Sequence, residues 1–272
     1  MKDRLTLFAI KLGAIATALA AAALFAFVIA FGVSAAFSAS DGAIFGFEWR
    51  PSENRFGVMA MLIDSLILSS IATVLGFGAA IAIVCNILAK NALSTALDRL
   101  VAFMSGFPTI LYAFVALFVF APILREKFGG AGLLCVVPVL ILLILPTMIT
   151  IMKSSLAPRL KRIETLAASL GFSPLEALFF VVLKNAKSAL IAAFLLGFGR
   201  AAGDTMIALM LSGNAPQIPS DIHESFRVLS AHMALATANE AGAAAFDSLY
   251  LAGAALLLIN LVLGACARLI AR

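Results

Sequence analysis

The sequence predicts an all-helical protein that crosses a membrane several times, and composition and hydropathy both indicate this fold class. Hydrophobic residues make up 63% of the 272 residues, charged residues make up only 12%, and the mean hydropathy is +1.12. Soluble domains are about half apolar and about a quarter charged. Apolar windows of about 20 residues, the length that a helix needs to cross a bilayer, recur along the chain. We therefore expect a single transmembrane domain over residues 1–272.

Six apolar windows are long enough to span the membrane. They cover residues 10–34, 60–89, 99–122, 131–152, 187–213 and 247–270. The first window could instead be a secretory signal, but its apolar run exceeds the roughly 7–15 residues of a signal core, so we expect an uncleaved helix. With the N-terminus inside, the basic loop residues left outside are Arg50, Arg55, Arg125, Lys127 and Arg227. The excess of Lys and Arg inside then predicts that both termini are cytoplasmic.

Three connecting segments are long enough to carry a function: outer loops near 35–58 and 214–246, and an inner loop near 153–186. In the inner loop, apolar residues recur at helical spacing before Gly171, which is a natural helix end, and Ser173-Pro174 can start a second helix. We expect two short amphipathic helices at the cytoplasmic surface. They could be solvated surface elements or a docking site for a cytoplasmic partner.

Glycine and proline interrupt two of the predicted spans. Residues 105–109, Ser-Gly-Phe-Pro-Thr, lie within the third window, and Pro138 and Pro146 lie within the fourth. Such residues break or kink helices, and transporters use these breaks where the backbone lines a cavity. Ordinary membrane helices tolerate kinks too, so this feature alone does not predict transport.

The sequence contains no recognisable catalytic or metal-binding set. His223 and His232 lack metal-ligand spacing, and we expect both at the surface. Asp64, near the outer end of the second window, is expected to cap a helix or lie at the membrane interface. The basic residues are dispersed, which argues against nucleic-acid binding. The cysteines all fall within predicted spans and are expected to be apolar packing residues: Cys85, Cys135 and Cys266.

The most informative segment is residues 199–205, Gly-Arg-Ala-Ala-Gly-Asp-Thr, inside the fifth window. Each charge at such a depth costs roughly 2.5–3.5 kcal/mol on insertion scales. Gly199 and Gly203 form a small-xxx-small face, so Arg200 and Asp204 are expected to point into a helix bundle. Side chains lean toward the helix N-terminus, so Arg200 reaches away from Asp204. Its planar donors could bind an oxyanion, or the two residues could form a structural pair.

Two segments resemble a known family. Residues 165–171, Thr-Leu-Ala-Ala-Ser-Leu-Gly, resemble the cytoplasmic Glu-Ala-Ala loop of bacterial ABC importer permeases. Residues 199–206 and 212–216 resemble the Gly-Arg-Ala-x-Gly-Glu-Thr-Met and Gly-Asn segments of phosphate ABC transporter permeases. Agreement with the C-type subunit of this importer, over the A-type subunit, continues at residues 49–51, 107–112, 122–125, 145–149, 217–219 and 229–232.

The resemblance implies a MetI-like permease fold and a multi-pass protein of the bacterial cytoplasmic (inner) membrane. Its implied partners are a homologous A-type permease subunit, two ATP-binding subunits and an extracytoplasmic phosphate-binding protein. The chain itself would bind no cofactor and hydrolyse nothing, because ATP is used by the partner subunits. Phosphate would pass Arg200, Asp204 and Thr205. The residues implied in ATPase coupling are Glu164, Thr165, Leu166, Ala167, Ala168 and Gly171.

The chain departs from the family pattern at several places. Thr165 stands where a glutamate is usual, with Glu164 displaced by one position; Lys184 replaces a usual proline; Asp204 replaces a glutamate; and residues 64–66, Asp-Ser-Leu, stand where Gly-Thr-Leu is usual. The first two concern coupling to ATP hydrolysis, whereas the third shortens a side chain and keeps its charge. Two alternatives stay open: the same kind of importer for molybdate, tungstate or sulfate, and a stand-alone ion-coupled transporter.

Overall fold

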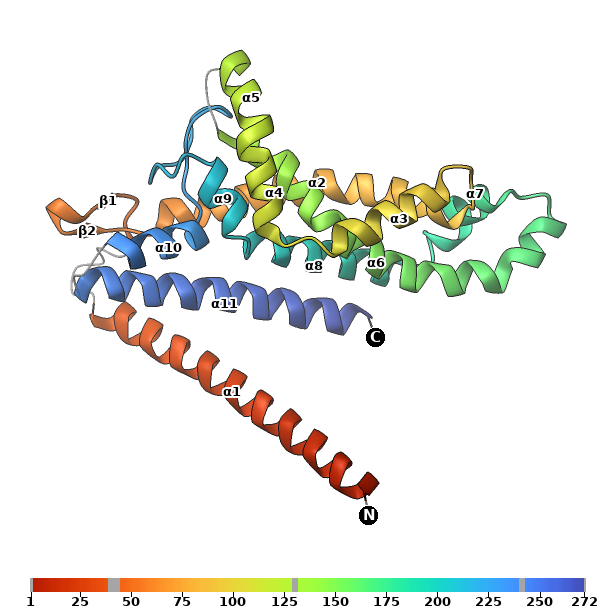
Figure 1. The fold of residues 1–272 in the computed structure, drawn as a ribbon, viewed down its shortest axis with the longest axis horizontal. Helices are drawn as coiled ribbons and strands as arrows, with labels where there is room; N and C mark the ends of the chain where they lie inside the picture. Colours follow the sequence, from red (N-terminus) through yellow and green to blue (C-terminus); the bar gives the residue numbers. More distant parts are fainter. Residues whose placement is uncertain (1, 39–44, 129–131, 240–242, 272) are drawn as a thin grey trace.

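The computed structural model describes residues 2–38, 45–128, 132–239 and 243–271, and it is mostly helical (Figure 1). The helices are α1 (Lys2–Ser38), α2 (Met59–Leu88), α3 (Ser94–Ser105), α4 (Thr109–Val115), α5 (Ala121–Phe128), α6 (Gly132–Ser169), α7 (Pro174–Ala177), α8 (Lys187–Ala202), α9 (Met206–Leu211), α10 (Leu229–Asn239) and α11 (Ala243–Ala271). Two π-helical segments, Ala116–Phe120 and Leu178–Val182, follow α4 and α7. A small antiparallel hairpin pairs β1 (Trp49–Arg50) with β2 (Arg55–Phe56) around a 3-10 turn, Pro51–Glu53.

The number of membrane spans agrees with the sequence prediction. In the described part of the chain, α1, α2, α6 and α11 contain runs long and apolar enough to cross a membrane, and two bent helix pairs bring the total to as many as six. The first pair is α3 with α4 and its continuation, bent by 104°, and the second is α7 and its π-helical extension with α8, bent by 88°. The predicted all-helical, polytopic architecture is confirmed, but the fifth span differs from the predicted window 187–213.

The fourth predicted span is part of a longer helix. α6 continues from Gly132 to Ser169 through all of its prolines, so they do not break the helix in the fourth predicted span. Packing explains this: a ridge of side chains spaced four residues apart is almost completely buried, and tertiary packing outweighs the weakened backbone hydrogen bonding at proline. The ridge consists of Leu140, Ile144, Met148, Met152 and Leu156.

The centre of the molecule is a bundle of α2, α6 and α8, and α11 packs on α8 from one side. α1 packs on α11 and diverges from it toward the N-terminus (Figure 1). In the same view, both termini and α7 lie toward one end of the molecule, whereas the β1–β2 hairpin and α10 lie toward the other. The elements that the sequence assigns to opposite membrane faces are therefore at opposite ends of the bundle.

The break predicted in the third span is present. α3 ends at Ser105, and α4 begins at Thr109 after Pro108 in an extended conformation. The Tyr112 hydroxyl donates a hydrogen bond of 2.8 Å to the Met104 carbonyl, which joins the two halves across the break. This bond satisfies a carbonyl near the end of α3 that the interrupted helix leaves without its usual partner.

Candidate substrate path and coupling segment

Arg200 lies in the last turn of α8, and its side chain is exposed. Its Nη1 atom donates a hydrogen bond of 2.8 Å to Thr147 Oγ1 on α6. Tyr112 on α4 lies within electrostatic reach of the same guanidinium. Elements that are far apart in the sequence therefore meet around one cation. The sequence predicts that Arg200 lies on the substrate path, but it assigns no role to Thr147.

Asp204 does not share a helix with Arg200, so the prediction of one continuous fifth helix is wrong. α8 ends at Ala202, with Gly203 as its cap. The Asp204 Oδ2 atom accepts a hydrogen bond of 2.9 Å from the Ile207 amide, which stabilises the start of α9. The physical reason is local competition, because aspartate binds nearby backbone amides and favours helix starts over helix interiors. Gly-Asp-Thr is therefore a readable signal for a helix end followed by a new helix start.

The side chains of Arg200 and Asp204 interact only at a distance. Arg200 acts electrostatically on Asp204, but no ion pair within 4.0 Å joins them among the residues that the structure describes. Their arrangement gives no support to a close structural pair. Arg200 is instead fixed by a neutral hydroxyl, which leaves its positive charge uncompensated at short range.

Close helix packing surrounds the Arg200 turn. A Cβ atom added to Gly197 would lie 2.1 Å from Met148 Cε, and one added to Gly199 would lie 2.9 Å from Asn260 Oδ1. The missing side chain of Gly197 thus lets α6 pack close to α8, and that of Gly199 lets α11 do the same. The predicted small-residue face is correct for Gly199, but Gly203 lies beyond the helix and ends it instead.

A cavity of about 780 Å³ lies beside the break between α8 and α9. Thr205 and Ser230 supply polar groups to its wall, and the Ser230 hydroxyl donates a hydrogen bond of 2.7 Å to the Asp204 carbonyl. The remaining wall comes mostly from apolar residues of α1, α10 and α11. Thr205 therefore faces a space that Arg200 does not line, so the predicted path residues do not converge on one cavity.

The coupling segment begins as a continuation of α6. The prediction of a separate first amphipathic helix is wrong, but its predicted end is right: Gly171 has a φ of +79°, a left-handed conformation that glycine adopts easily. The predicted start of the second helix is also right. Ser173 and Glu176 cap α7 reciprocally, with Pro174 at its first turn.

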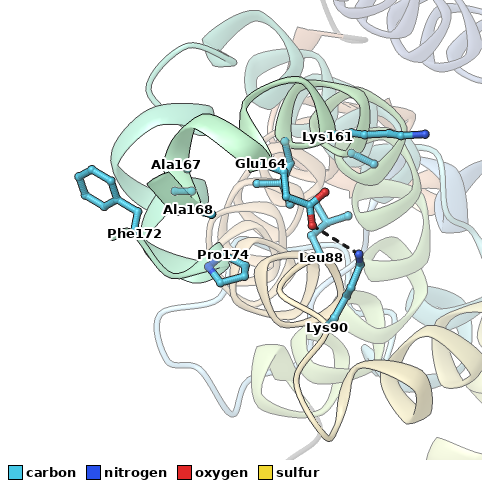
Figure 2. A pocket seen from close by; sticks show the side chains of 11 residues that line it. Leu88, Lys90, Lys161, Glu164, Ala167, Ala168, Phe172 and Pro174 are labelled. Atoms are coloured by element: carbon cyan, nitrogen blue, oxygen red, sulfur yellow. Dashed lines mark ion pairs between the residues drawn. The ribbon is translucent and has the colours of Figure 1, made fainter. Parts of the chain in front are cut away.

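Three of the six predicted coupling residues line a pocket of about 510 Å³ between the ends of α2 and α6 and the start of α7. Figure 2 shows the Glu164 carboxylate pointing to the Lys90 ammonium, 3.6 Å away. Ala167 and Ala168 also line this pocket, whereas Leu166 is 64% exposed and does not. Thr165 and Gly171 are exposed outside the pocket lining.

A buried polar corner lies near the N-terminal end of α2 and was missed from the sequence. Asp64 is 2% exposed and His232 is 0% exposed. Among the described residues, neither the Asp64 oxygens nor the His232 nitrogens have a hydrogen-bond partner of normal geometry, although the backbone amide of Arg227 interacts with the Asp64 carboxyl. Beside these two residues a hydrogen bond joins α10 to α2: the Leu229 amide donates to Ser65 Oγ over 2.8 Å. The predictions of Asp64 as a cap or interface residue and of His232 as a surface residue are wrong. Tertiary packing buries them, and single-sequence patterns do not report it.

His232 lies in α10, outside the candidate spans, with its ring 4.2 Å from the Trp49 ring in an edge-on arrangement. Burial, and to a smaller extent the positive charge of Arg227, lowers the pKa of His232 to about 4. The imidazole is therefore neutral at pH 7. No group of three or more His, Cys, Asp or Glu side chains that could hold a metal ion occurs in the part of the chain that the structure describes.

The sequence was compared with those of known protein families and proteins. The sequence profile of the family described as "Binding-protein-dependent transport system inner membrane component" matches residues 72–272. The chain is 28% identical over 221 residues to the "Phosphate transport system permease protein PstC" of Pasteurella multocida, covering 71% of this chain and 67% of the relative.

Two further relatives extend the comparison. The protein of the same name from Mesorhizobium japonicum is 26% identical over 245 residues, which cover 81% of this chain and 75% of that protein. The "Probable ABC transporter permease protein YqgH" of Bacillus subtilis is 27% identical over 179 residues, which cover 63% of this chain and 58% of that protein. The profile match includes α6, α8 and the coupling segment between them.

Proposed function

Because the chain belongs to the family of binding-protein-dependent transport system inner membrane components, we propose that it is the transmembrane permease subunit of an ATP-driven importer of inorganic phosphate. The names of its relatives favour phosphate as the substrate. In this proposal the protein lies in the bacterial cytoplasmic membrane with both termini inside. It pairs with a homologous permease subunit and works by alternating access. Two partner subunits hydrolyse ATP, an extracytoplasmic protein delivers phosphate, and this chain binds no cofactor.

The observation that carries the proposal is the state of Arg200. Its guanidinium is exposed within an apolar bundle and is bonded to the hydroxyl of Thr147. A guanidinium offers five N–H donors in a planar fork that matches phosphate oxygens, and one of its bonds is used here. Among the described residues no carboxylate lies within 4.0 Å of this guanidinium, so its positive charge is available to attract an anion. Arg200 therefore serves as the substrate contact in this proposal.

Asp204 and Thr205 have supporting roles in this proposal. Asp204 fixes the start of α9 through its bond to the Ile207 amide and moderates the positive potential of Arg200 from a distance. Thr205 lines the neighbouring cavity and offers a hydroxyl to a passing solute.

The coupling segment carries a surface suited to binding an intracellular partner. Leu166, Leu170 and Phe172 are 64%, 67% and 41% exposed near the turn between α6 and α7. Apolar side chains gathered at a helical turn are typical of a protein interface. We assign this surface, together with Glu164 and the pocket of Figure 2, to contact with the ATP-hydrolysing subunits.

The test uses the complete transporter, purified with its partner subunits and reconstituted into liposomes. Uptake of radiolabelled phosphate, sulfate and molybdate is measured with and without ATP and the binding protein. We expect ATP-dependent phosphate uptake that is abolished by Arg200→Gln without loss of assembly. Arg268→Gln is the matched control, because Arg268 is an exposed arginine in the last turn of α11. Normal uptake by the Arg200 variant, or a preference for sulfate or molybdate, would contradict the proposal.

A further inference from the structure

One helix connects the coupling residues to the substrate arginine. α6 runs without interruption from Gly132 to Ser169 and carries both Thr147 and Glu164. The two residues are 17 positions apart, which corresponds to about 26 Å along a helix with a rise of 1.5 Å per residue. The proposed ATPase contact and the partner of Arg200 are therefore parts of the same secondary-structure element.

The helices α6 and α8 pack closely where Thr147 meets Arg200. Met148, the residue after Thr147, is fully buried and fills the space above Gly197, one turn before Arg200 on α8. A longer side chain at position 197 would meet the Met148 side chain, so the two helices approach as closely as their backbones and this methionine allow. Packed side chains of this kind transmit displacement because protein interiors are dense.

The guanidinium itself is attached to this unit by the hydroxyl of Thr147. An arginine side chain is long and flexible, so packing of the α8 backbone does not by itself fix the orientation of its donors. The nearby Tyr112 hydroxyl donates to the Met104 carbonyl, and Asp204 Oδ2 accepts from the Ile207 amide. Among the described residues, the hydrogen bond that orients the cation is the one from Nη1 to Thr147 Oγ1.

A hydroxyl is suited to this task because it is neutral. A carboxylate at position 147 would hold the guanidinium more strongly, but it would also neutralise the charge that attracts an anion. A threonine oxygen fixes one N–H and leaves both the net charge and the remaining donors available. The local chemistry therefore combines a fixed orientation with an uncompensated charge.

We propose that Thr147 is the positioning residue that ties the guanidinium of Arg200 to the helix carrying the coupling residues. Movement of the coupling segment and movement of the substrate contact are then one event. The inference rests on the proposed function, because it takes Arg200 as the anion contact. It assigns Thr147 a role in coupling transport to ATP hydrolysis, beyond a contribution to folding.

The test compares Thr147→Val, which keeps the shape and removes the acceptor, with Thr147→Ser, which keeps the hydroxyl. Thr150→Val is the matched control, since the Thr150 hydroxyl donates to the Pro146 carbonyl on the same helix and does not contact Arg200. Phosphate uptake and ATP hydrolysis are measured together in the reconstituted complex. A hydrogen bond to a charged group is worth enough that we expect Thr147→Val to lower uptake by roughly tenfold, with ATP hydrolysis within about twofold of the parent.

The number of ATP molecules hydrolysed per phosphate transported therefore rises in Thr147→Val and stays at the parent value in Thr147→Ser and Thr150→Val. Equal losses of uptake and hydrolysis, or failure of Thr147→Ser to restore coupling, would show a structural role and overturn the inference. Should Thr147→Val fail to assemble, Thr147→Ala is measured against Thr147→Ser by the same ratio. A second measurement adds Thr147→Val to Arg200→Lys, where we expect a further change of less than about twofold because one residue acts through the other.

The Arg200→Gln arm separates this inference from the proposed function. Normal uptake in Arg200→Gln contradicts the function itself. Loss of uptake in Arg200→Gln with parent-like coupling in Thr147→Val leaves the function standing and overturns the role of Thr147.

Discussion

Two regions of this apolar bundle hold ionisable residues in opposite surroundings. Around Arg200, the cation is exposed and has a hydroxyl partner on the neighbouring helix. In the corner of Asp64 and His232, both side chains are buried, and their polar atoms have no hydrogen-bond partner of normal geometry within the part of the chain that the structure describes. The first region keeps its charge available to a ligand, whereas the second encloses polar groups where no ligand reaches them.

This difference separates a functional site from a destabilising one. Burying a polar group without a partner costs free energy, and an unpaired charge costs more. An exposed and hydrogen-bonded cation avoids most of this penalty and can still bind an anion. We therefore expect substitutions around Arg200 to change transport with little effect on stability, and substitutions in the buried corner to change stability with little effect on transport.

The largest stability effect is expected from Asp64→Asn. Asparagine has nearly the same shape and removes the ionisable carboxyl, whose oxygens have no hydrogen-bond partner of normal geometry among the described residues. We expect the free energy of unfolding at pH 7 to rise by about 3 kcal/mol, because a carboxyl group that ionises in the unfolded chain costs more to bury than a neutral amide does. Denaturant unfolding of the purified protein in detergent measures the change.

Transport by Asp64→Asn tests the division between the two regions. We expect uptake within about twofold of the parent, because Asp64 is buried and belongs to neither the proposed substrate path nor the coupling segment. A strong loss of uptake in a well-folded Asp64→Asn protein would place Asp64 in the transport machinery and break the comparison.

The next largest effect is a fall in the free energy of unfolding at low pH, and it is caused by His232. Its pKa is lowered to about 4 in the folded protein, against 6.5 for the free side chain. Between these values the unfolded chain binds a proton that the folded protein does not, so stability falls as the pH falls below about 6.5. From 1.36 kcal/mol per pH unit, the loss at pH 5 is about 2 kcal/mol, and at pH 7 it is absent.

His232→Gln removes this proton and should lose correspondingly less stability between pH 7 and pH 5. The comparison is made on the difference between the two proteins, because other acidic groups titrate in both. His223→Gln is the control, since that residue is only partly buried. Parallel pH curves for parent and His232→Gln would mean that the corner opens to water in the folded protein.

A smaller effect is expected from Asp204, where two roles can be separated. Asp204→Asn keeps an oxygen that can accept the Ile207 amide, whereas Asp204→Ala removes both the acceptor and the charge. We expect a loss of about 1 kcal/mol in the free energy of unfolding for alanine and little change for asparagine. If uptake falls equally in both variants, the charge is what matters for transport; a loss in alanine alone assigns the role to the helix start.

The sequence predicts these two regions very unequally, and the reason is physical. Arg200 and Asp204 stand out because charges in an apolar window are expensive wherever the chain folds. Helix number, the break before Thr109 and the turn at Gly171 are likewise local properties of hydropathy, proline and glycine. The Thr147–Arg200 bond joins residues 53 positions apart, and the burial of His232 depends on how α10 packs on α2. Such contacts follow from tertiary packing, which no local pattern in one sequence reports.

The smallest expected effect is at the exposed ion pair of Lys90 and Glu164, and it tests whether exposure is the variable that separates the regions. The side chains are 81% and 54% exposed, and their charged atoms are 3.6 Å apart. Water screens such a pair, so Lys90→Gln should change the free energy of unfolding by less than about 0.5 kcal/mol. Denaturant unfolding of Lys90→Gln beside Asp64→Asn makes the contrast direct. A change at Lys90 as large as that at Asp64 would show that burial does not decide the energetic weight of a charge in this protein. A small change would show that exposure separates two kinds of charge. Exposed charges can bind a partner at little cost, whereas buried charges destabilise the folded protein.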